Sequence, residues 1–213
     1  DITFGFMTAV NTATQAIDKL HSTAEAHHRV MILEVMGRVS GWVALESGIA
    51  GGADVILIPE IPYDIHKVAR AILERRNAGK GFSIIVAAEG AKPAGSKAEN
   101  EKDADGEFAF QGGTSNFLAK ELESLTSIET RITILGYLQR GGDPSPYDRI
   151  LATRFGASTV KMIHNGEVNR MVCMDQQTIK SIPLQETAGR NRLVSPVGEV
   201  VGIARDMGVS FGD

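Results

Sequence analysis

The chain has few cysteines and no excess of basic residues. Cys173 is its single cysteine and cannot form an internal disulfide, so we expect a reducing, cytoplasmic location. The 22 lysines and arginines are outnumbered by 26 aspartates and glutamates, which gives a formal net charge of −4. Non-specific binding of nucleic acid requires a basic face, so no nucleic-acid partner is expected.

Long hydrophobic runs are also missing. No stretch approaches the ~20 apolar residues that span a bilayer, and no signal-peptide pattern opens the sequence, so no membrane partner is expected. The 213 residues are enough for one large domain or two modest ones. The chain begins at Asp1 rather than at methionine, with a helix-like pattern and no strand before it. We therefore expect it to be a fragment of a longer protein.

Short, nearly continuous apolar runs predict strands that are buried on both faces, as in a parallel sheet. These runs are residues 30–35, 55–58, 83–88 and 131–138. Patterns typical of helices lie between and around them, at residues 3–27, 42–51, 64–79, 116–125 and 146–164. Strands that alternate with helices of about 15 residues indicate βαβ units, and hence an α/β fold with a three-layer, Rossmann-like lobe.

Other segments do not fit this alternation. Residues 92–107 are rich in charged and small residues without periodicity, which predicts a mobile surface loop. Residues 168–174 and 180–184 are further strand candidates, and Cys173 within the first of them is expected to be buried. Glycines and prolines cluster at residues 141–146, so we expect the chain to leave the first lobe there.

Ligands of parallel α/β sheets bind at the carboxyl ends of strands, which makes the residues at these ends candidates for a site. The candidates are Met36, Gly37, Arg38, Glu89, Tyr137 and Arg140. Arginine has a planar fork that matches phosphate, and glycine lets a ligand approach the backbone. A carboxylate cannot bind phosphate but suits hydroxyl groups. The combination points to a sugar phosphate.

Each candidate also has a purely structural interpretation. A strand-end arginine is often part of a surface ion pair, Gly37 could serve a turn, and Glu89 could cap the next turn. Tyr137 could be a core residue with its hydroxyl group at the rim. Their gathering at one sheet edge favours function. His27 and His28 lack a cysteine or acidic partner at metal-ligand spacing, so no metal site is expected.

Several sequence blocks together resemble the 6-phosphofructokinase family. They are residues 28–29, 34–38 (EVMGR), 48–52, 58–60 and 135–142 (LGYLQRGG), followed by Pro144 and residues 148–149. The second and last of the five blocks are highly specific at this separation, and the similarity extends to about Met174. The long first helix and the charged segment 92–107 are more like the mixed ATP/pyrophosphate branch than the short bacterial type.

The resemblance implies a glycolytic enzyme that transfers a phosphoryl group from ATP or pyrophosphate, with Mg²⁺, to the 1-hydroxyl of fructose 6-phosphate. It implies that Met36, Gly37 and Arg38 hold the sugar phosphate and that Arg38 is catalytic, because it also faces the transferred group. It further implies that Glu89 binds sugar hydroxyls and Arg140 the 6-phosphate. Tyr137 stands where many relatives have histidine.

The resemblance also bears on assembly and control. Arg29 and Arg131 open their strands, at the edge opposite to the candidates, and match arginines that the family lends to a neighbouring subunit. A homodimer or homotetramer with a shared site is therefore expected. His21 and Ala78 replace basic residues of the family's effector site, while residues 54 and 80 keep compatible chemistry. Weak or absent effector control is predicted.

The resemblance divides the chain into three parts. Residues 1–138 are expected to form the fructose 6-phosphate lobe, 139–188 to contribute to part of a second, donor-binding α/β lobe, and 189–213 to pack back on the first lobe. The family's glycine-rich donor segments and catalytic base have no counterpart in this sequence, so the chain alone is expected to be inactive. A non-catalytic sugar-phosphate-binding module, or a structural lobe of a larger assembly, are the alternatives.

Overall fold

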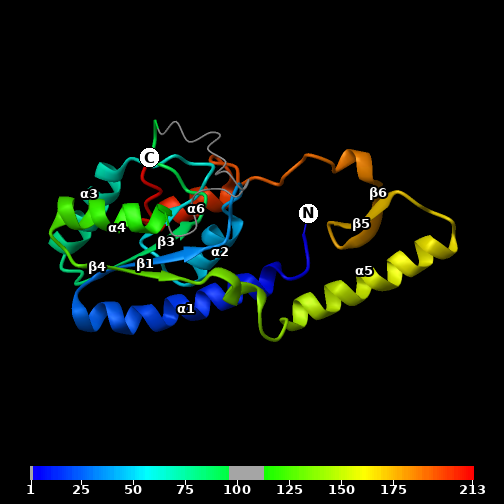
Figure 1. The fold of residues 1–213 in the computed structure, drawn as a ribbon, viewed down its shortest axis with the longest axis horizontal. Coiled ribbons are helices and arrows are strands. Elements are labelled where there is room, and N and C mark those ends of the chain that lie inside the picture. Colours follow the sequence, from blue (N-terminus) through cyan, green and yellow to red (C-terminus); the bar gives the residue numbers. More distant parts are fainter. Residues whose placement is uncertain (1, 96–112) are drawn as a thin grey trace.

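A parallel sheet forms the centre of the larger part of the molecule (Figure 1). The computed structural model describes residues 2–95 and 113–213. The sheet contains β1 (Val30–Val35), β2 (Val55–Leu57), β3 (Ser83–Ala88) and β4 (Thr130–Ile134), in the order β2-β3-β1-β4. All pairs are parallel, and Val30 of β1 is level with Ser83 and Thr130 on its two neighbours. The predicted α/β class with a parallel sheet is confirmed.

Helices cover both faces of the sheet and give the expected three layers. On one face lie α1 (Phe6–His27), α2 (Trp42–Ala50) and α6 (Glu199–Asp206), which share a buried cluster with Met31, Leu33 and Val35 of β1. On the other face lie α3 (Ile65–Asn77) and α4 (Gly113–Thr126), which pack on Val30 and Ile32. Because alternate residues of β1 enter opposite layers, the apolar run carries no polar face.

One charged residue interrupts this core. Glu34 lies on β1, one of the two inner strands of the sheet, and is 3% exposed. Its Oε2 accepts a hydrogen bond of 2.5 Å from Ser115 Oγ at the start of α4, and Ser115 N lies 3.3 Å from the same oxygen. Thr114, the neighbouring residue, donates from Oγ1 to the carbonyl oxygen of Glu89 at 3.1 Å. The beginning of α4 is thus fixed to the carboxyl end of the sheet.

The second part of the molecule is an arm beside the lobe (Figure 1). It consists of α5 (Pro146–His164) and an antiparallel hairpin of β5 (Arg170–Asp175) and β6 (Thr178–Pro183), followed by the short 3-10 helix η2 (Leu184–Glu186). Leu151, Phe155 and Met174 form its small buried cluster. The chain then returns to the lobe, where Val194, Val201 and Phe211 join the α1 side of the core.

Some expectations about single elements were wrong. The fourth strand ends at Ile134 instead of 138, because Gly136 takes a left-handed φ of +49° and the chain turns into the 3-10 helix η1 (Gly136–Arg140). Cys173 is half-buried rather than buried, in a hairpin that packs on α5 over a small buried cluster. Most of the predicted loop 92–107 lies outside the described residues.

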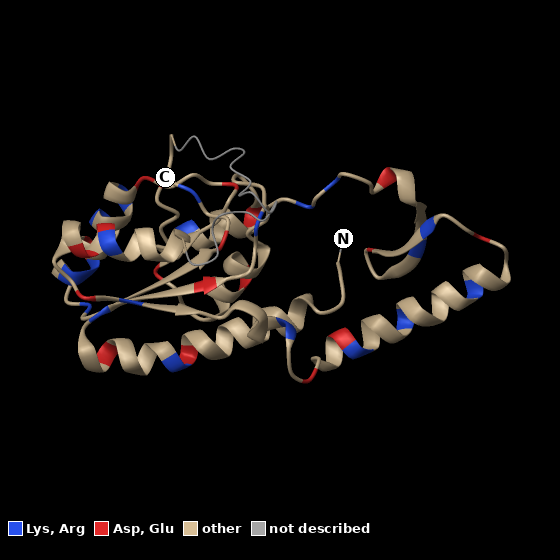
Figure 2. Cartoon of the chain, viewed as in Figure 1, with Lys and Arg blue, Asp and Glu red and all other residues tan. Residues whose placement is uncertain are grey.

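Charges are spread over both parts of the molecule. Lys and Arg are interspersed with Asp and Glu along the lobe and the arm rather than gathered by sign (Figure 2). None of the helices within the described ranges is long and apolar enough to cross a membrane.

Candidate functional site

Three neighbouring strands end beside the residues that the sequence singles out. Glu89 follows β3, Met36 follows β1, and η1 follows β4. Val35 pairs with Ala88 and Glu34 with Ile134, so the three strands end at the same level. The carboxyl edge of the sheet therefore collects the candidates that were expected to lie together.

The segment of residues 36–41, here called the Arg38 loop, is held at its start by the two neighbouring strand ends. Met36 N donates to Gln139 Oε1 of η1 at 3.2 Å, and Gly37 N donates to Glu89 Oε1 at 3.4 Å. Gly90 N donates to the carbonyl oxygen of Gly37 at 3.1 Å. The loop is thereby fixed to the β3 and β4 ends while Arg38 extends from it.

Arg38 and Glu89 face each other across this edge. Arg38 Nε lies 3.8 Å from Glu89 Oε1, and the side chains are 54% and 22% exposed. An ion pair of this length and exposure contributes at most ~1 kcal/mol, so the Arg38 guanidinium stays available to an anion. A phosphate-binding fork and a carboxylate that can accept hydroxyl protons thus lie within a few ångströms of each other.

The 3-10 helix η1 brings two more candidates to the same edge. Tyr137 is 73% exposed, which excludes a core role, and Arg140 is exposed at the last position of η1. Between them Gln139 is 1% exposed and bonds both Met36 N and the carbonyl oxygen of Gly136. Sequence reasoning missed Gln139 as an anchor, although it belongs to the LGYLQRGG block.

Arg29 and Arg131 lie at the opposite, amino edge of the sheet, as the sequence predicts. Arg29 Nε bonds Glu129 Oε2 at 2.6 Å, and Arg131 Nη2 bonds the other oxygen of the same carboxylate. The hydrogen bond from Arg29 is the main reason that the pKa of Glu129 lies below its ordinary value. Within one chain the two arginines are therefore separated from Arg38 and Glu89 by the length of the sheet.

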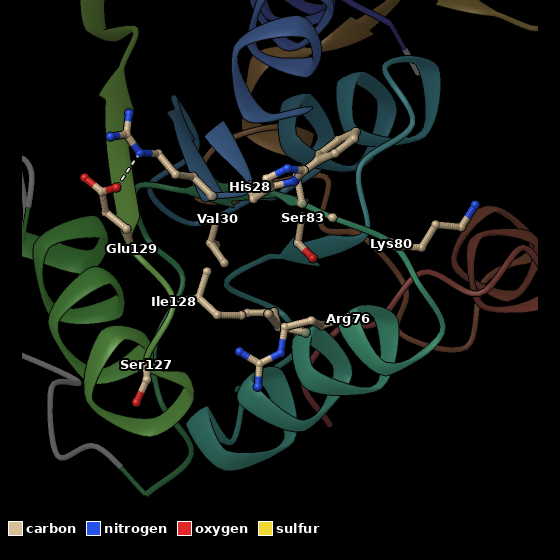
Figure 3. Close-up of a pocket in the computed structure, with 12 residues that line it drawn as sticks. His28, Val30, Arg76, Lys80, Ser83, Ser127, Ile128 and Glu129 are labelled. Carbon is tan, nitrogen blue, oxygen red and sulfur yellow. Dashed lines mark hydrogen bonds and ion pairs between the residues drawn. The ribbon is translucent and has the colours of Figure 1, made fainter. Parts of the chain in front are cut away.

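A hollow of about 370 Å³ opens at this amino edge, between the sheet and the ends of α3 and α4 (Figure 3). Arg29 and Glu129 line one wall, and Arg76, Lys80 and Ser83 line others. Two positions that the resemblance assigns to an effector site have partners within the chain. His21 Nε2 lies 2.7 Å from the carbonyl oxygen of Gly51, and Asp54 pairs with Arg75 Nη2 at 2.8 Å. Weak effector control stays a prediction.

No group of three or more His, Cys, Asp or Glu side chains that could hold a metal ion occurs in the part of the chain that the structure describes. His27 and His28 are both exposed at the end of α1. The residues described at the site thus offer carboxylate, guanidinium and backbone groups to a ligand, but no metal-binding cluster.

Comparison with known proteins gives consistent matches. The family model described as Phosphofructokinase matches residues 1–163. An ATP-dependent 6-phosphofructokinase of Chloroflexus aurantiacus is 50% identical over all 213 residues, and ATP-dependent 6-phosphofructokinase 2 of Clostridium perfringens is 50% identical over 216 aligned residues. The chain spans 58% and 59% of the length of these two relatives.

Solved structures agree with these sequence matches. Phosphofructokinase from Saccharomyces cerevisiae matches with a TM-score of 0.74 and 32% identity, over 87% of this chain and 24% of that one. A pyrophosphate-dependent phosphofructokinase from Marinobacter aquaeolei matches with a TM-score of 0.70 and 24% identity, over 95% of this chain and 50% of that one. The second similarity shows the fold alone.

Proposed function

The chain belongs to the phosphofructokinase family, and we propose that it forms the fructose 6-phosphate side of a 6-phosphofructokinase. This enzyme would transfer a phosphoryl group from ATP or pyrophosphate to the 1-hydroxyl of fructose 6-phosphate, a step of glycolysis in the cytoplasm. The observation that carries the proposal is the exposed Arg38 guanidinium, 3.8 Å from the Glu89 carboxylate at the carboxyl edge of the sheet.

The two side chains have complementary roles in this proposal. Phosphoryl transfer depends on positioning and on stabilisation of negative charge, and the Arg38 guanidinium supplies a positive charge on a planar fork that fits phosphate. Arg38 would hold the transferred group and the sugar beside it. Glu89 would accept hydrogen bonds from the sugar hydroxyls, and its place is fixed because Thr114 binds its carbonyl oxygen. The backbone of Met36 and Gly37 would complete this wall.

The 6-phosphate would lie toward η1. Arg140 and Tyr137 are both exposed there, and each can donate a hydrogen bond to phosphate. Arg29 and Arg131 would act on the site of a neighbouring subunit, in a homodimer or homotetramer. Their position at the amino edge and their common carboxylate, Glu129, support a role away from their own chain's site.

The donor and Mg²⁺ belong to the part of the reaction that these residues do not supply. The names of the 50%-identical relatives support ATP, whereas a pyrophosphate-dependent enzyme shares the fold. The described residues do not fit a Mg²⁺ site, so we propose that the ion enters with the donor phosphates, and we assign it no step. The chain spans 58% of the length of the Chloroflexus aurantiacus relative. We therefore also propose that, by itself, it binds the sugar phosphate without turnover.

Calorimetric titration of the chain with fructose 6-phosphate tests the proposal. We expect saturable binding that Arg38→Ala weakens at least about tenfold, the effect of losing a charge-assisted contact to phosphate. Arg70→Ala is the matched control, because Arg70 is 67% exposed on α3 and pairs only loosely with Glu74 at 3.9 Å. Absence of binding, or equal loss in both variants, would contradict the sugar-phosphate site. Turnover with ATP or pyrophosphate would contradict the inactivity of the isolated chain.

A further inference from the structure

A glutamate outside the predicted site joins two segments that meet at the Arg38 loop. Glu60 follows β2, and its carboxylate accepts hydrogen bonds from Gly41 N, at 3.1 and 3.0 Å from the two oxygens. The same Oε1 accepts a bond of 2.8 Å from Val194 N. One carboxylate thus holds the last residue of the Arg38 loop together with residues 190–194, here called the strap.

The strap makes further contacts with the same end of the loop. It is the segment by which the chain returns from the arm to the lobe (Figure 1). The carbonyl oxygen of Arg192 accepts hydrogen bonds from Ser40 Oγ and from Trp42 Nε1, both at 3.0 Å. The Arg192 guanidinium also lies over the Trp42 ring, 4.8 Å from its centroid. Burial raises the pKa of the nearby Glu46, and the charge of Arg192 partly opposes that rise.

These contacts determine where Arg38 can lie. The loop is held at its start by Gln139 and Glu89 and at its end by Glu60 and the strap, while the side chains of Arg38 and Val39 between them are exposed. The end of the loop is tightly packed against the residue that follows β2, because a Cβ added at Gly41 would lie only 2.3 Å from the side chain of Ile58. The position of Arg38 therefore depends on both ends, and Glu60 is the group that fixes the second.

A carboxylate suits this position for a chemical reason. Glu60 faces two backbone N–H donors, and an ionised carboxylate offers only acceptors. An amide of the same shape would keep only one acceptor oxygen. Because Gly41 N faces both carboxylate oxygens, either orientation of the amide would bring its NH₂ group against this N–H donor. Loss of a hydrogen bond to a charged group costs more than loss of one between neutral groups, and the contact of two donors adds to this cost.

We propose that Glu60 is a positioning residue that holds Arg38 opposite Glu89 by clamping the end of the Arg38 loop to the strap. In its effect on ligand binding, the proposal rests on the proposed function, because it takes Arg38 to contact fructose 6-phosphate.

The test compares Glu60→Gln with Asp64→Asn. Asp64 lies four residues away and caps α3 by accepting from His66 N at 2.8 Å, and asparagine is an equally good cap. Trp42 is the only tryptophan, so its emission reports the clamp directly. In E60Q we expect a red shift, stronger quenching by acrylamide, and about tenfold weaker binding of fructose 6-phosphate, equivalent to ~1.4 kcal/mol. In D64N we expect both properties within about twofold of the parent.

The environment of Arg38 can also be followed by NMR without ligand, from the Nε–H resonance of its ¹⁵N-labelled guanidinium. This resonance is assigned by its disappearance in Arg38→Lys. A shift of this resonance in E60Q but not in D64N supports the proposal. An unchanged resonance, or unchanged fructose 6-phosphate affinity despite altered Trp42 emission, overturns it. If the parent chain binds no fructose 6-phosphate, the proposed function fails while the Nε–H resonance still decides the clamp.

A urea titration of each variant shows whether E60Q is still folded. If it is not, a milder variant tests the same proposal. Ser40→Ala removes one bond to the Arg192 carbonyl oxygen and leaves Glu60 in place. We expect the same direction of change in Trp42 emission and in the Arg38 resonance, with a smaller amplitude. An S40A chain identical to the parent in both readouts would overturn the coupling between strap and loop.

Discussion

Close backbone contact at Gly90 brings the acidic Glu89 and the basic Arg38 of the site together. A Cβ at Gly90 would lie 1.9 Å from the carbonyl oxygen of Arg38 and 2.6 Å from its carbonyl carbon. Both are backbone atoms, so neither can move without moving the Arg38 loop. The glycine follows Glu89 directly, and any side chain there separates Glu89 from Arg38.

Gly90→Ala is therefore expected to damage binding and stability together. We expect fructose 6-phosphate to bind at least about tenfold more weakly, and the free energy of unfolding to fall by ~1–3 kcal/mol, the usual cost of overpacking. Calorimetry and urea denaturation measure the two effects. Gly156→Ala is the control, since it lies in α5 with no atom near its Cβ and should gain up to ~1 kcal/mol. Parental affinity in Gly90→Ala would show that the loop can shift freely.

The location of the site residues at strand ends could be predicted, because the apolar runs of the buried strands show where each strand ends. Arg38 and Glu89 follow apolar runs, so their meeting at the carboxyl edge follows from the parallel sheet alone. Gln139 and Glu60 were not predictable as anchors. Their partners lie 103 and 134 residues away in the sequence, and a hydrogen bond between such distant positions leaves no periodic signal.

Among the elements, the buried strands and the long helices were predicted well because their apolar periodicity is strong. The 3-10 helix η1 was not, since the apolar residues at 135 and 138 continue the run of β4. Only the left-handed conformation of Gly136, an effect of local backbone geometry, ends the strand there. The hairpin β5–β6 was found as two strands, but its antiparallel pairing came from the structure.

A buried aspartate of α5, the helix of the arm, is hydrogen-bonded to α1, a helix of the lobe. Asp148 in the first turn of α5 is 2% exposed, and its Oδ2 accepts hydrogen bonds from Thr8 N at 2.7 Å and from the Thr8 hydroxyl group. Ser145 Oγ lies 3.2 Å from the same oxygen. Burial raises the pKa of Asp148, but these hydrogen bonds more than offset it, so the pKa lies below its ordinary value of 3.8.

The stability that Asp148 provides should depend on pH in one direction. A carboxyl group with a lowered pKa in the folded state stabilises above its unfolded pKa of 3.8, and this contribution is lost as pH falls through the folded pKa. We expect Asp148→Asn to lower the free energy of unfolding by ~1.5–3 kcal/mol at pH 7, with a smaller difference near pH 3. Urea denaturation at both pH values measures it. Asp143→Asn, at a fully exposed neighbour, should change little, and a difference independent of pH would refute the assignment.

At the scale of the whole molecule, the lobe and the arm differ in how much they bury. The lobe has two extensive clusters, one on each face of its sheet, whereas the arm has only Leu151, Phe155 and Met174. Along the arm Ile150, Val160, Ile163 and Val168 are between 63% and 72% exposed. A segment with few buried contacts opens at lower free energy than a packed core.

Amide hydrogen exchange should therefore separate α5 from α1, two helices of similar length with 19 and 22 residues. We expect the amides of α5 beyond Phe155 and those of β5–β6 to exchange faster than those of α1, whose Val10, Ala13 and Ile17 are buried against the lobe. This difference in exchange rate should be the same at several protein concentrations if the apolar residues of the arm are exposed to solvent. Equal protection of α5 and α1 would mean that the exposed apolar residues of the arm are covered in solution, and protection that rises with concentration would identify a second copy of the chain as the cover.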